Sequence, residues 1–286
     1  MVRSRIPKVL ITAGAILVFF VLAGATYQGV ATAVERRQFP HPGRLVDVGG
    51  HQLHLSCGGE GLPTVVLEAA GTGMSSAWAW VQADLERATR VCSYDRAGLG
   101  WSEAGDRGYD PAAVPESLNA LLTRAGERGP YVMVGQGLGA PLATLFASRF
   151  PADVLGLVLI DPPAAAREAA RANAKARMVN VSPWLARTGL LRASRMLSRQ
   201  AAGLPEPAAG ALAAFLNRPD HLTRSARELA RWDETVALAA QAPLDGGLDV
   251  ARIEAAGGDP VALLTDREQA TTATSTILAV IARHPN

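Results

Sequence analysis

The stretch YVMVGQGLG at residues 131–139 is an apolar run that ends in three closely spaced glycines. Its first part, 131–134, has the length and composition of a short buried strand, and 138–150 predicts a helix that Pro151 ends. A second apolar run without polar alternation follows at 154–160. Continuous apolar strands separated by a helix are typical of a parallel sheet that helices cover on both faces.

The same strand–turn–helix order continues on both sides of this stretch. The expected strands lie at 45–48, 53–57, 64–68, 90–94 and 261–265, and the expected helices at 78–89, 115–124 and 271–283. The first two strands flank a Gly-Gly pair and predict a hairpin. Residues 164–250 interrupt the order, because this Ala- and Arg-rich segment predicts helices and contains no convincing strand. No repeat of solenoid or propeller period is present.

The N-terminal segment differs from the rest of the chain. A basic segment, residues 1–8, precedes a stretch without charged residues at 9–34. A helix needs about 20 apolar residues to cross a bilayer, so this stretch predicts a transmembrane anchor. A cleaved signal peptide is the competing interpretation, because A-x-A sequences occur at 23–25 and 31–33. In both cases the basic segment should stay cytoplasmic, and the remainder of the protein should be extracytoplasmic.

A linker at 35–44 leads into residues 45–286, which we expect to form one globular domain. The chain has 286 residues and is 49% apolar, which excludes global disorder. Its formal charge of +2 gives no reason to expect a nucleic-acid partner. Two cysteines are too few for a disulfide scaffold or a cysteine-only zinc site. The sequence predicts neither a metal nor a cofactor.

Three segments carry a resemblance to a known family: VLEAAGTGMSS at 66–76, YDRAGLGWS at 94–102 and YVMVGQGLG at 131–139. In this order they resemble the α/β-hydrolase superfamily, in particular its membrane-anchored or secreted bacterial members. The second segment is the most specific, because it occupies a fixed loop in that family. The resemblance implies an α/β fold with a mostly parallel sheet and a helical cap inserted at 164–250, preceded by one transmembrane helix. The last strand and helix of the family are expected to be missing.

The family's nucleophile stands at the centre of a G-x-S-x-G turn between a strand and a helix. Here the turn keeps its spacing, but Gly137 occupies the serine position and supplies no nucleophile, and Gln136 precedes it. Glycine adopts positive φ freely, so Gly137 should relieve the strain of such a turn. The resemblance implies that the oxyanion hole would use the backbone N–H groups of Leu138 and of Thr72.

The family's catalytic histidine is expected after the last strand, and no histidine of this sequence fits that place. The five histidines are His41 in the linker, His51 and His54 in the first hairpin, His221 in the cap and His284 near the end. Asp161 and Asp266 each follow an expected strand and are candidates for the acid, although both also read as turn residues. The resemblance therefore implies a pseudoenzyme with a binding or regulatory role, and a small acyl or apolar ligand under the cap.

Other interpretations stay open. The protein could hydrolyse esters or related acyl compounds through a non-standard site, or the sequence could be a truncated reading frame. Residues 135–140 also fit G-x-G-x-x-A, with Asp161 about 20 residues further on, which is typical of dinucleotide binding. Four expected strands precede this turn, however, and the segment 95–102 has no place in that interpretation. Residues 184–199 could form a basic amphipathic helix on lipid headgroups, or an ordinary cap helix.

Cys57 and Cys92 lie on the second and fourth expected strands, which are neighbours in the strand order that the resemblance implies. Adjacent strands bring Cα atoms within disulfide distance, so we expect a disulfide if the domain is exported. Two buried free thiols are the alternative.

Overall fold

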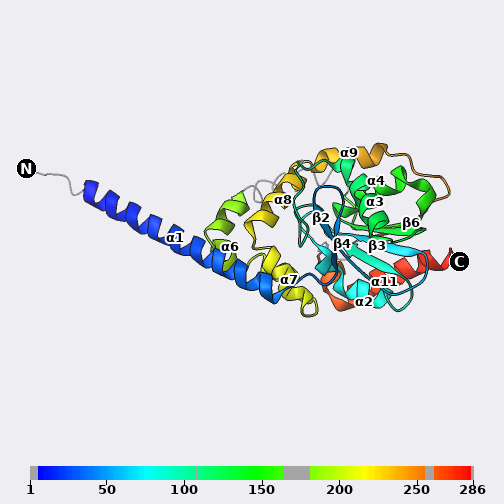
Figure 1. Ribbon diagram of the computed structural model, residues 1–286, viewed down its shortest axis with the longest axis horizontal. Helices are drawn as coiled ribbons and strands as arrows, with labels where there is room; N and C mark the ends of the chain where they lie inside the picture. The colour runs from blue at the N-terminus through cyan, green and yellow to red at the C-terminus, as the bar shows by residue number, and fades with distance from the viewer. Residues whose placement is uncertain (1–5, 107, 164–180, 255–260, 285–286) are drawn as a thin grey trace, which may run out of the picture.

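A seven-stranded sheet forms the centre of the protein, in the order β1-β2-β4-β3-β5-β6-β7 (Figure 1). The computed structural model describes residues 6–106, 108–163, 181–254 and 261–284. β1 pairs with β2 and β2 with β4 in antiparallel fashion, and the other neighbours are parallel. The mostly parallel sheet that the resemblance implies is therefore confirmed.

The elements alternate along the chain as the apolar runs predict. The strands are β1 (Arg44–Asp47), β2 (Gln52–Gly58), β3 (Thr64–Glu68), β4 (Val91–Tyr94), β5 (Tyr131–Gln136), β6 (Val154–Ile160) and β7 (Asp249–Ile253). The helices are α1 (Ile6–Gln38), α2 (Ala79–Leu85), α3 (Val114–Ala125), α4 (Gly139–Arg149), α6 (Leu190–Ser194), α7 (Ala208–Phe215), α8 (Pro219–Ala230), α9 (Trp232–Gln241), α10 (Ala262–Thr265) and α11 (Arg267–Ala282). Short 3₁₀ turns lie at Ser75–Trp78, Pro111–Ala113, Pro151–Asp153 and Ser198–Ala201.

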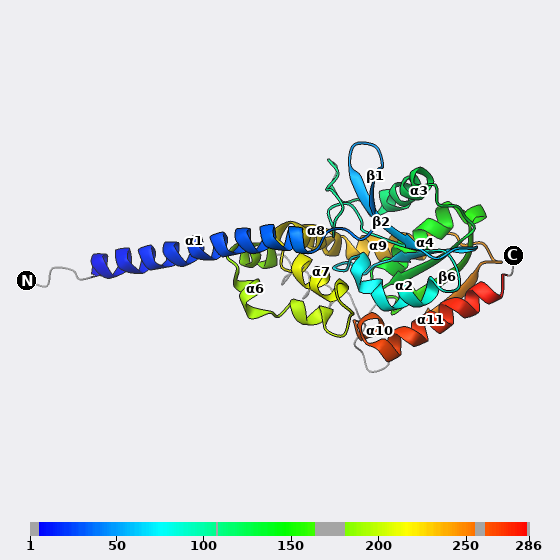
Figure 2. The ribbon, with the colours of Figure 1, turned by 60° about the horizontal axis from the view of Figure 1, so that its bottom comes forward.

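Helices cover both faces of the sheet, because successive side chains of a strand point to opposite faces. On β5, Val132 and Val134 join the core that includes side chains of α2 and α11. Met133, between them, joins the core that includes side chains of α3 and α4. Figure 2 shows α2 and α11 on one side of the strands and α3 on the other. Buried strands of this kind explain the absence of polar alternation in the sequence.

Helix α1 leaves the body as a single projecting rod, and the two ends of the chain lie at opposite ends of the molecule (Figures 1 and 2). It is 33 residues long, and its part Leu10–Gln38 is apolar and long enough to cross a membrane. Helices α6, α7 and α8, which belong to the predicted cap, lie beside the C-terminal half of α1 (Figures 1 and 2). The predicted N-terminal helix is thus continuous with the linker, which is helical up to Gln38.

Three predictions about the C-terminal half were wrong. The expected strand at 261–265 is α10, since a run of four or five apolar residues fits a strand and a helix equally well. β7 lies at the boundary of the segment expected to contain no strand; it is a half-exposed edge strand whose charged side chains hide the apolar pattern. The expected helix at 184–199 is broken at Gly189, where φ is +72°. Residues 164–180 of the predicted cap lie outside the described residues.

Candidate functional site

The turn between β5 and α4 keeps the tight geometry that a nucleophile would require. A Cβ on Gly135 would lie 2.4 Å from Gly139 O, and a Cβ on Gly139 would lie 2.4 Å from Glu68 O, so only glycine fits at either position. Gly137, at the apex, has φ +52°, and a Cβ there would meet only Ala70 Cβ at 3.7 Å. The apex therefore has room for a side chain, but any residue other than glycine would be strained there.

Helix α8 packs against the loop after β3, next to this turn. Leu138 at the start of α4 and Leu229 of α8 both lie against Gly71, in the loop after β3 that contains Thr72. Leu138 is 1% exposed and Leu229 is 8% exposed. The two backbone segments predicted to form the oxyanion hole are thus neighbours, and the side chains of Leu138 and Leu229 pack beside them, while Thr72 and Gly137 are partly exposed.

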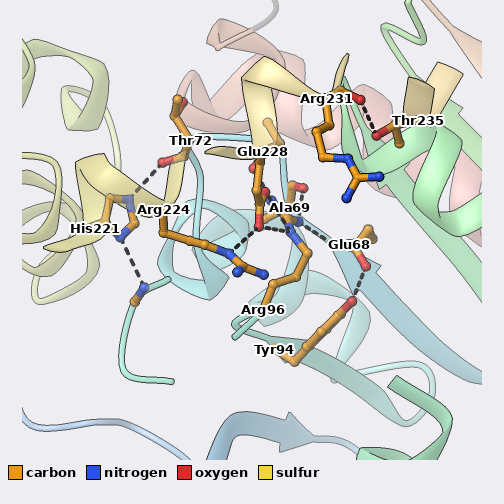
Figure 3. Close-up of polar contacts among 12 residues, drawn as sticks. Glu68, Ala69, Thr72, Tyr94, Arg96, His221, Arg224, Glu228, Arg231 and Thr235 are labelled. Atoms are coloured by element: carbon orange, nitrogen blue, oxygen red, sulfur yellow. Dashed lines mark hydrogen bonds and ion pairs between the residues drawn. The ribbon is translucent and has the colours of Figure 1, made fainter. Parts of the chain in front are cut away.

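Charged side chains meet in the interior between the loop after β4 and α8 (Figure 3). Arg96 pairs with Glu68 through Nη1, and its Nη2 donates to Glu228 Oε2 at 2.8 Å. The side chains of Arg96, Glu68 and Glu228 are 3%, 1% and 0% exposed, so solvent does not screen these pairs. Arg224 Nε adds a hydrogen bond of 3.2 Å to Glu228 Oε1. Two cations and two anions therefore balance one another inside the protein.

Arg96 also ties this cluster to the loop after β3. Its guanidinium donates to the carbonyl oxygens of Ala69 at 2.7 Å and Ala70 at 3.0 Å. The Tyr94 hydroxyl donates to Glu68. Although burial alone would lower it, the pKa of Arg96 lies well above its ordinary value because Glu228 and Glu68 stabilise the cation. We call Arg96, Glu68, Glu228 and Arg224 the ion cluster.

The sequence did not identify this cluster as a unit. Glu68 and Arg96 stand in two of the segments that carry the family resemblance, but their partner Glu228 is 132 residues from Arg96. An acidic residue four positions after an arginine on a predicted helix reads as a surface pair, since the sequence gives no sign that this helix face is buried. Only the placement of α8 over the sheet brings the three side chains together.

His221 connects the cap to both loops. Its Nδ1 accepts a hydrogen bond from the Gly100 N–H at 3.1 Å, so the proton is on Nε2, which donates to Thr72 O at 3.1 Å (Figure 3). Burial lowers the pKa of His221 below its usual value. The side chain therefore serves as a neutral bridge between α8, the loop after β4 and the predicted oxyanion loop. The sequence analysis placed this residue in the cap and gave it no role.

His54 of β2 is completely buried and belongs to the sheet. Its Nδ1 donates to Asp95 Oδ2 at 2.9 Å, and its Nε2 accepts from the Gly43 N–H at 3.3 Å. Ser75 Oγ lies 3.4 Å from the same Nδ1. A serine–histidine–aspartate relay uses the two ring nitrogens for different partners, so this arrangement is structural. Burial would raise the pKa of Asp95, but the hydrogen bond from His54 and those from backbone N–H groups hold it below its usual value.

The two acid candidates have different surroundings. Asp161 follows β6 at the same edge of the sheet as Gly137, whose N–H donates to Ile160 O at 2.9 Å. Asp266 follows helix α10, and its carboxylate caps α11 by accepting the N–H groups of Glu268 and Gln269. Asp266 is thus a helix-capping residue at a place where the sequence predicted the end of a strand.

His284 lies far from this edge of the sheet. Its Nε2 is 3.6 Å from Asp249 Oδ2, at the beginning of β7. β7 runs parallel to β6, and Ile253 at its end pairs with Ile160. Asp249 and His284 therefore lie at the opposite edge of the sheet from Gly137, and His284 does not face the turn.

Cys57 and Cys92 form a disulfide between β2 and β4, with their Cα atoms 4.1 Å apart. A carboxylate oxygen of Glu127 lies within 4.8 Å of the two sulfur atoms. Thiolates bind metals, whereas the sulfurs of a disulfide do not act as thiolates, so this group is no metal centre.

Two surface pockets lie on the cap side, with volumes of about 420 Å³ and 270 Å³. The larger is lined by residues between Arg199 and Gly203 and by residues near Asp266, and the smaller by Trp184, Arg187, Arg227 and their neighbours. Neither is lined by Gly137, Thr72 or Asp161.

Comparison with known proteins agrees with this architecture. Residues 63–237 match the family model described as the alpha/beta hydrolase fold. A 2-hydroxy-6-oxo-2,4-heptadienoate hydrolase of Pseudomonas putida is 32% identical over 121 residues, which cover 41% of this chain and 44% of that protein. The chain spans only 14% to 44% of the length of the curated relatives that it matches.

Solved structures share the fold at low identity. The epoxide hydrolase CorEH aligns with a TM-score of 0.67 and 16% identity, over 85% of this chain and 99% of that one. A bacterial membrane phospholipase A aligns with a TM-score of 0.60 and 21% identity, over the whole of both chains. At these identities the likeness concerns the fold alone.

Proposed function

Because the chain belongs to the alpha/beta hydrolase fold family, we propose that it is a membrane-anchored member without serine-hydrolase turnover, which acts by binding or regulation. One observation carries this proposal. The turn that should present the nucleophile has its full geometry, but a glycine stands at its apex. The reactive group is absent while the surrounding backbone is retained.

The histidines support the same conclusion. His54 and His221 use both ring nitrogens in other contacts, and His284 lies at the opposite edge of the sheet. A serine at the apex would therefore have no general base among them. Removing the members of such a triad costs about 10⁶-fold in turnover, with a residual 10³–10⁴-fold over water from the oxyanion hole and binding.

Ester hydrolysis by the purified full chain tests the proposal. We expect the wild type, Gly137→Ser and the matched control Gly137→Ala to hydrolyse short acyl nitrophenyl esters equally slowly. A fluorophosphonate probe, which labels activated serines, should label none of the three. Saturable hydrolysis by the wild type would contradict the proposal, because it would require a nucleophile elsewhere in the chain. Rapid labelling of Gly137→Ser would show that a base is present after all.

The proposed orientation places the domain on the extracytoplasmic side. Arg3, Arg5 and Lys8 precede the apolar helix, and basic flanks stay in the cytoplasm. The Cys57–Cys92 disulfide supports this orientation, since disulfides persist in oxidising compartments. Protease added to intact cells should remove the domain, while a protease-resistant membrane fragment should remain. Protection of the domain until the cells are lysed would reverse the orientation.

A further inference from the structure

The cap exposes a group of large apolar side chains close to α1. Val181, Trp184, Leu185, Leu190 and Met196 are 53%, 70%, 37%, 59% and 50% exposed. We call this surface, within residues 181–196, the cap tip. We propose that the cap tip lies in the interfacial layer of the bilayer that α1 spans, with anionic lipid headgroups on its arginines. This inference rests on the proposed role of α1 as a membrane anchor.

The position of the cap along α1 matches the thickness of a bilayer. The cap tip meets α1 at Gly24, where an added Cβ would lie 2.0 Å from Thr188 O, so glycine permits this close approach. Residues 9–23, between the basic segment and Gly24, project alone (Figures 1 and 2). These residues span about 22 Å as a helix, most of the ~30 Å of a hydrocarbon core. The cap tip therefore begins near the end of that core, where the interfacial layer starts.

Polar contacts fix the cap to α1 in this position. Gln28 of α1 is 4% exposed, and its Nε2 donates to Asn217 O at 2.8 Å. Arg192 of α6 donates to Gln28 Oε1 at 2.9 Å and forms an ion pair with Glu35. These contacts span two turns of α1, so the cap cannot rotate about the helix without breaking them. The apolar surface therefore keeps one orientation relative to the membrane.

The charge of the cap tip suits a lipid surface. Residues 181–200 contain no acidic residue and four arginines; Arg192 is paired with Glu35, which leaves Arg187, Arg195 and Arg199 for a lipid surface. The guanidinium of Arg187 lies 5.0 Å from the ring centre of Trp184. Both line the 270 Å³ pocket together with Arg227 and Thr223, and no carboxylate of the part of the chain that the structure describes lines it. Tryptophan prefers the headgroup region and arginine binds phosphate, so this pocket fits the phosphate of an anionic lipid.

Continuity with α1 favours a bilayer over a protein partner as the occupant. The exposed apolar side chains of α1, among them Phe19, Phe20 and Leu22, lead directly to the cap tip. An apolar surface so close to a membrane-spanning helix is buried by lipid without any further component. If the cap tip instead binds another protein, it should stay in water when the bilayer contains no other protein. The experiment below distinguishes these two outcomes.

A fluorophore attached to the cap tip tests the proposal. The full chain carrying Leu190→Cys, labelled with an environment-sensitive dye, is placed in lipid nanodiscs and compared with Glu116→Cys. Both sites are exposed, and Glu116 lies on α3 of the sheet domain. We expect headgroup-region spin-labelled lipid to quench the dye at 190 about threefold more than the dye at 116, with blue-shifted emission. Equal quenching and water-like emission at both sites would overturn the inference.

A second arm tests the headgroups. Nanodiscs of phosphatidylcholine alone are compared with nanodiscs that also contain phosphatidylglycerol, which should increase quenching at 190. Arg187→Gln with Arg227→Gln should abolish this increase, whereas the matched control Arg149→Gln, on α4, should keep it. An increase that survives the double substitution, or no increase in the wild type, would overturn the assignment of anionic headgroups to these arginines.

The same samples also show whether α1 keeps the protein in the membrane. Protein that stays with the nanodisc while the dye at 190 reports water overturns only the placement of the cap tip. Protein that washes off the nanodisc under alkaline conditions overturns the anchor and this inference together.

Discussion

The turns after β4 and β5 lie at the same end of the sheet, on either side of β3, and differ in what they retain. The turn after β5 keeps its backbone geometry but carries no reactive side chain at Gly137. The turn after β4 keeps a dense set of buried charges around Arg96, joined to the cap through Glu228. Backbone shape in this fold thus depends on packing and glycine placement, and it persists independently of the chemistry that it could support.

The largest expected loss of stability comes from a substitution in the turn after β4. Arg96→Met would leave Glu68 and Glu228 buried without their shared cation, and such a loss costs about 3–5 kcal/mol. Urea unfolding of the detergent-solubilised chain should show a correspondingly lower midpoint. Arg149→Met is the control, because its pair with Glu116 is exposed and should contribute less than ~1 kcal/mol. Equal effects of the two substitutions would mean that the ion cluster adds nothing to stability.

Removing the disulfide measures how much the link between β2 and β4 contributes to stability. Cys57→Ala with Cys92→Ala opens a loop with a sequence separation of 35. Closing a loop of that length stabilises a protein by about 3–4 kcal/mol in the chain-entropy model. Unfolding of the double variant against the wild type measures the loss. Mass spectrometry after alkylation without reductant should find the native protein unmodified, and two alkylated thiols would refute the bond.

The turn after β5 should respond less strongly, and through backbone strain alone. Gly137→Ala introduces a Cβ at φ +52°, where space is available, so we expect a loss of about 1–3 kcal/mol. Gly246→Ala is the matched control, since nothing lies within 4 Å of its added Cβ and its φ is not in the left-handed region. A Gly137→Ala protein as stable as the wild type would show that the apex carries no strain.

The smallest expected effect on stability comes from His221, which bridges the loops after β3 and β4. Burial lowers the pKa of His221, so near pH 6.5 the unfolded chain takes up a proton that the folded protein does not bind. The stabilising contribution of neutral His221 is therefore fully present above about pH 6.5, and it decreases as the pH falls toward the pKa of His221 in the folded protein. The slope is at most about 1.4 kcal/mol per pH unit. His221→Gln should flatten stability between pH 5 and 7, as roughly expected for one titrating group.

His41→Gln is the control for this measurement, since His41 is exposed on the linker side of the protein. It should keep the pH dependence of the wild type. An unchanged slope in His221→Gln would assign the titration to another group.

Local patterns predicted the parts of the fold that depend on neighbouring residues. The apolar runs at 131–134 and 154–160 became β5 and β6, and the three glycines at 135, 137 and 139 correctly marked the turn where β5 ends. The run at 261–265 failed because four residues of helix and of strand have the same composition. β7 was missed because an edge strand buries only part of its surface.

The sequence predicted the missing nucleophile of the candidate site but not the buried ion cluster that the site contains. The position of Gly137 follows from the spacing of the turn, and the strand order of the family indicated the pairing of Cys57 with Cys92. The ion cluster and the bridge formed by His221 depend on how α8 lies over the sheet. Such long-range charge pairs have no signature in the local sequence, because an arginine and a glutamate read alike whether they are exposed or buried.

The glycine at position 137 also has an evolutionary consequence. On the proposed function, a serine at the apex would add strain without turnover, and a histidine introduced near it would find no hydroxyl to activate. Each single substitution toward catalysis would therefore lower fitness or leave it unchanged, so a lineage that had lost the reaction in this way would not readily regain it.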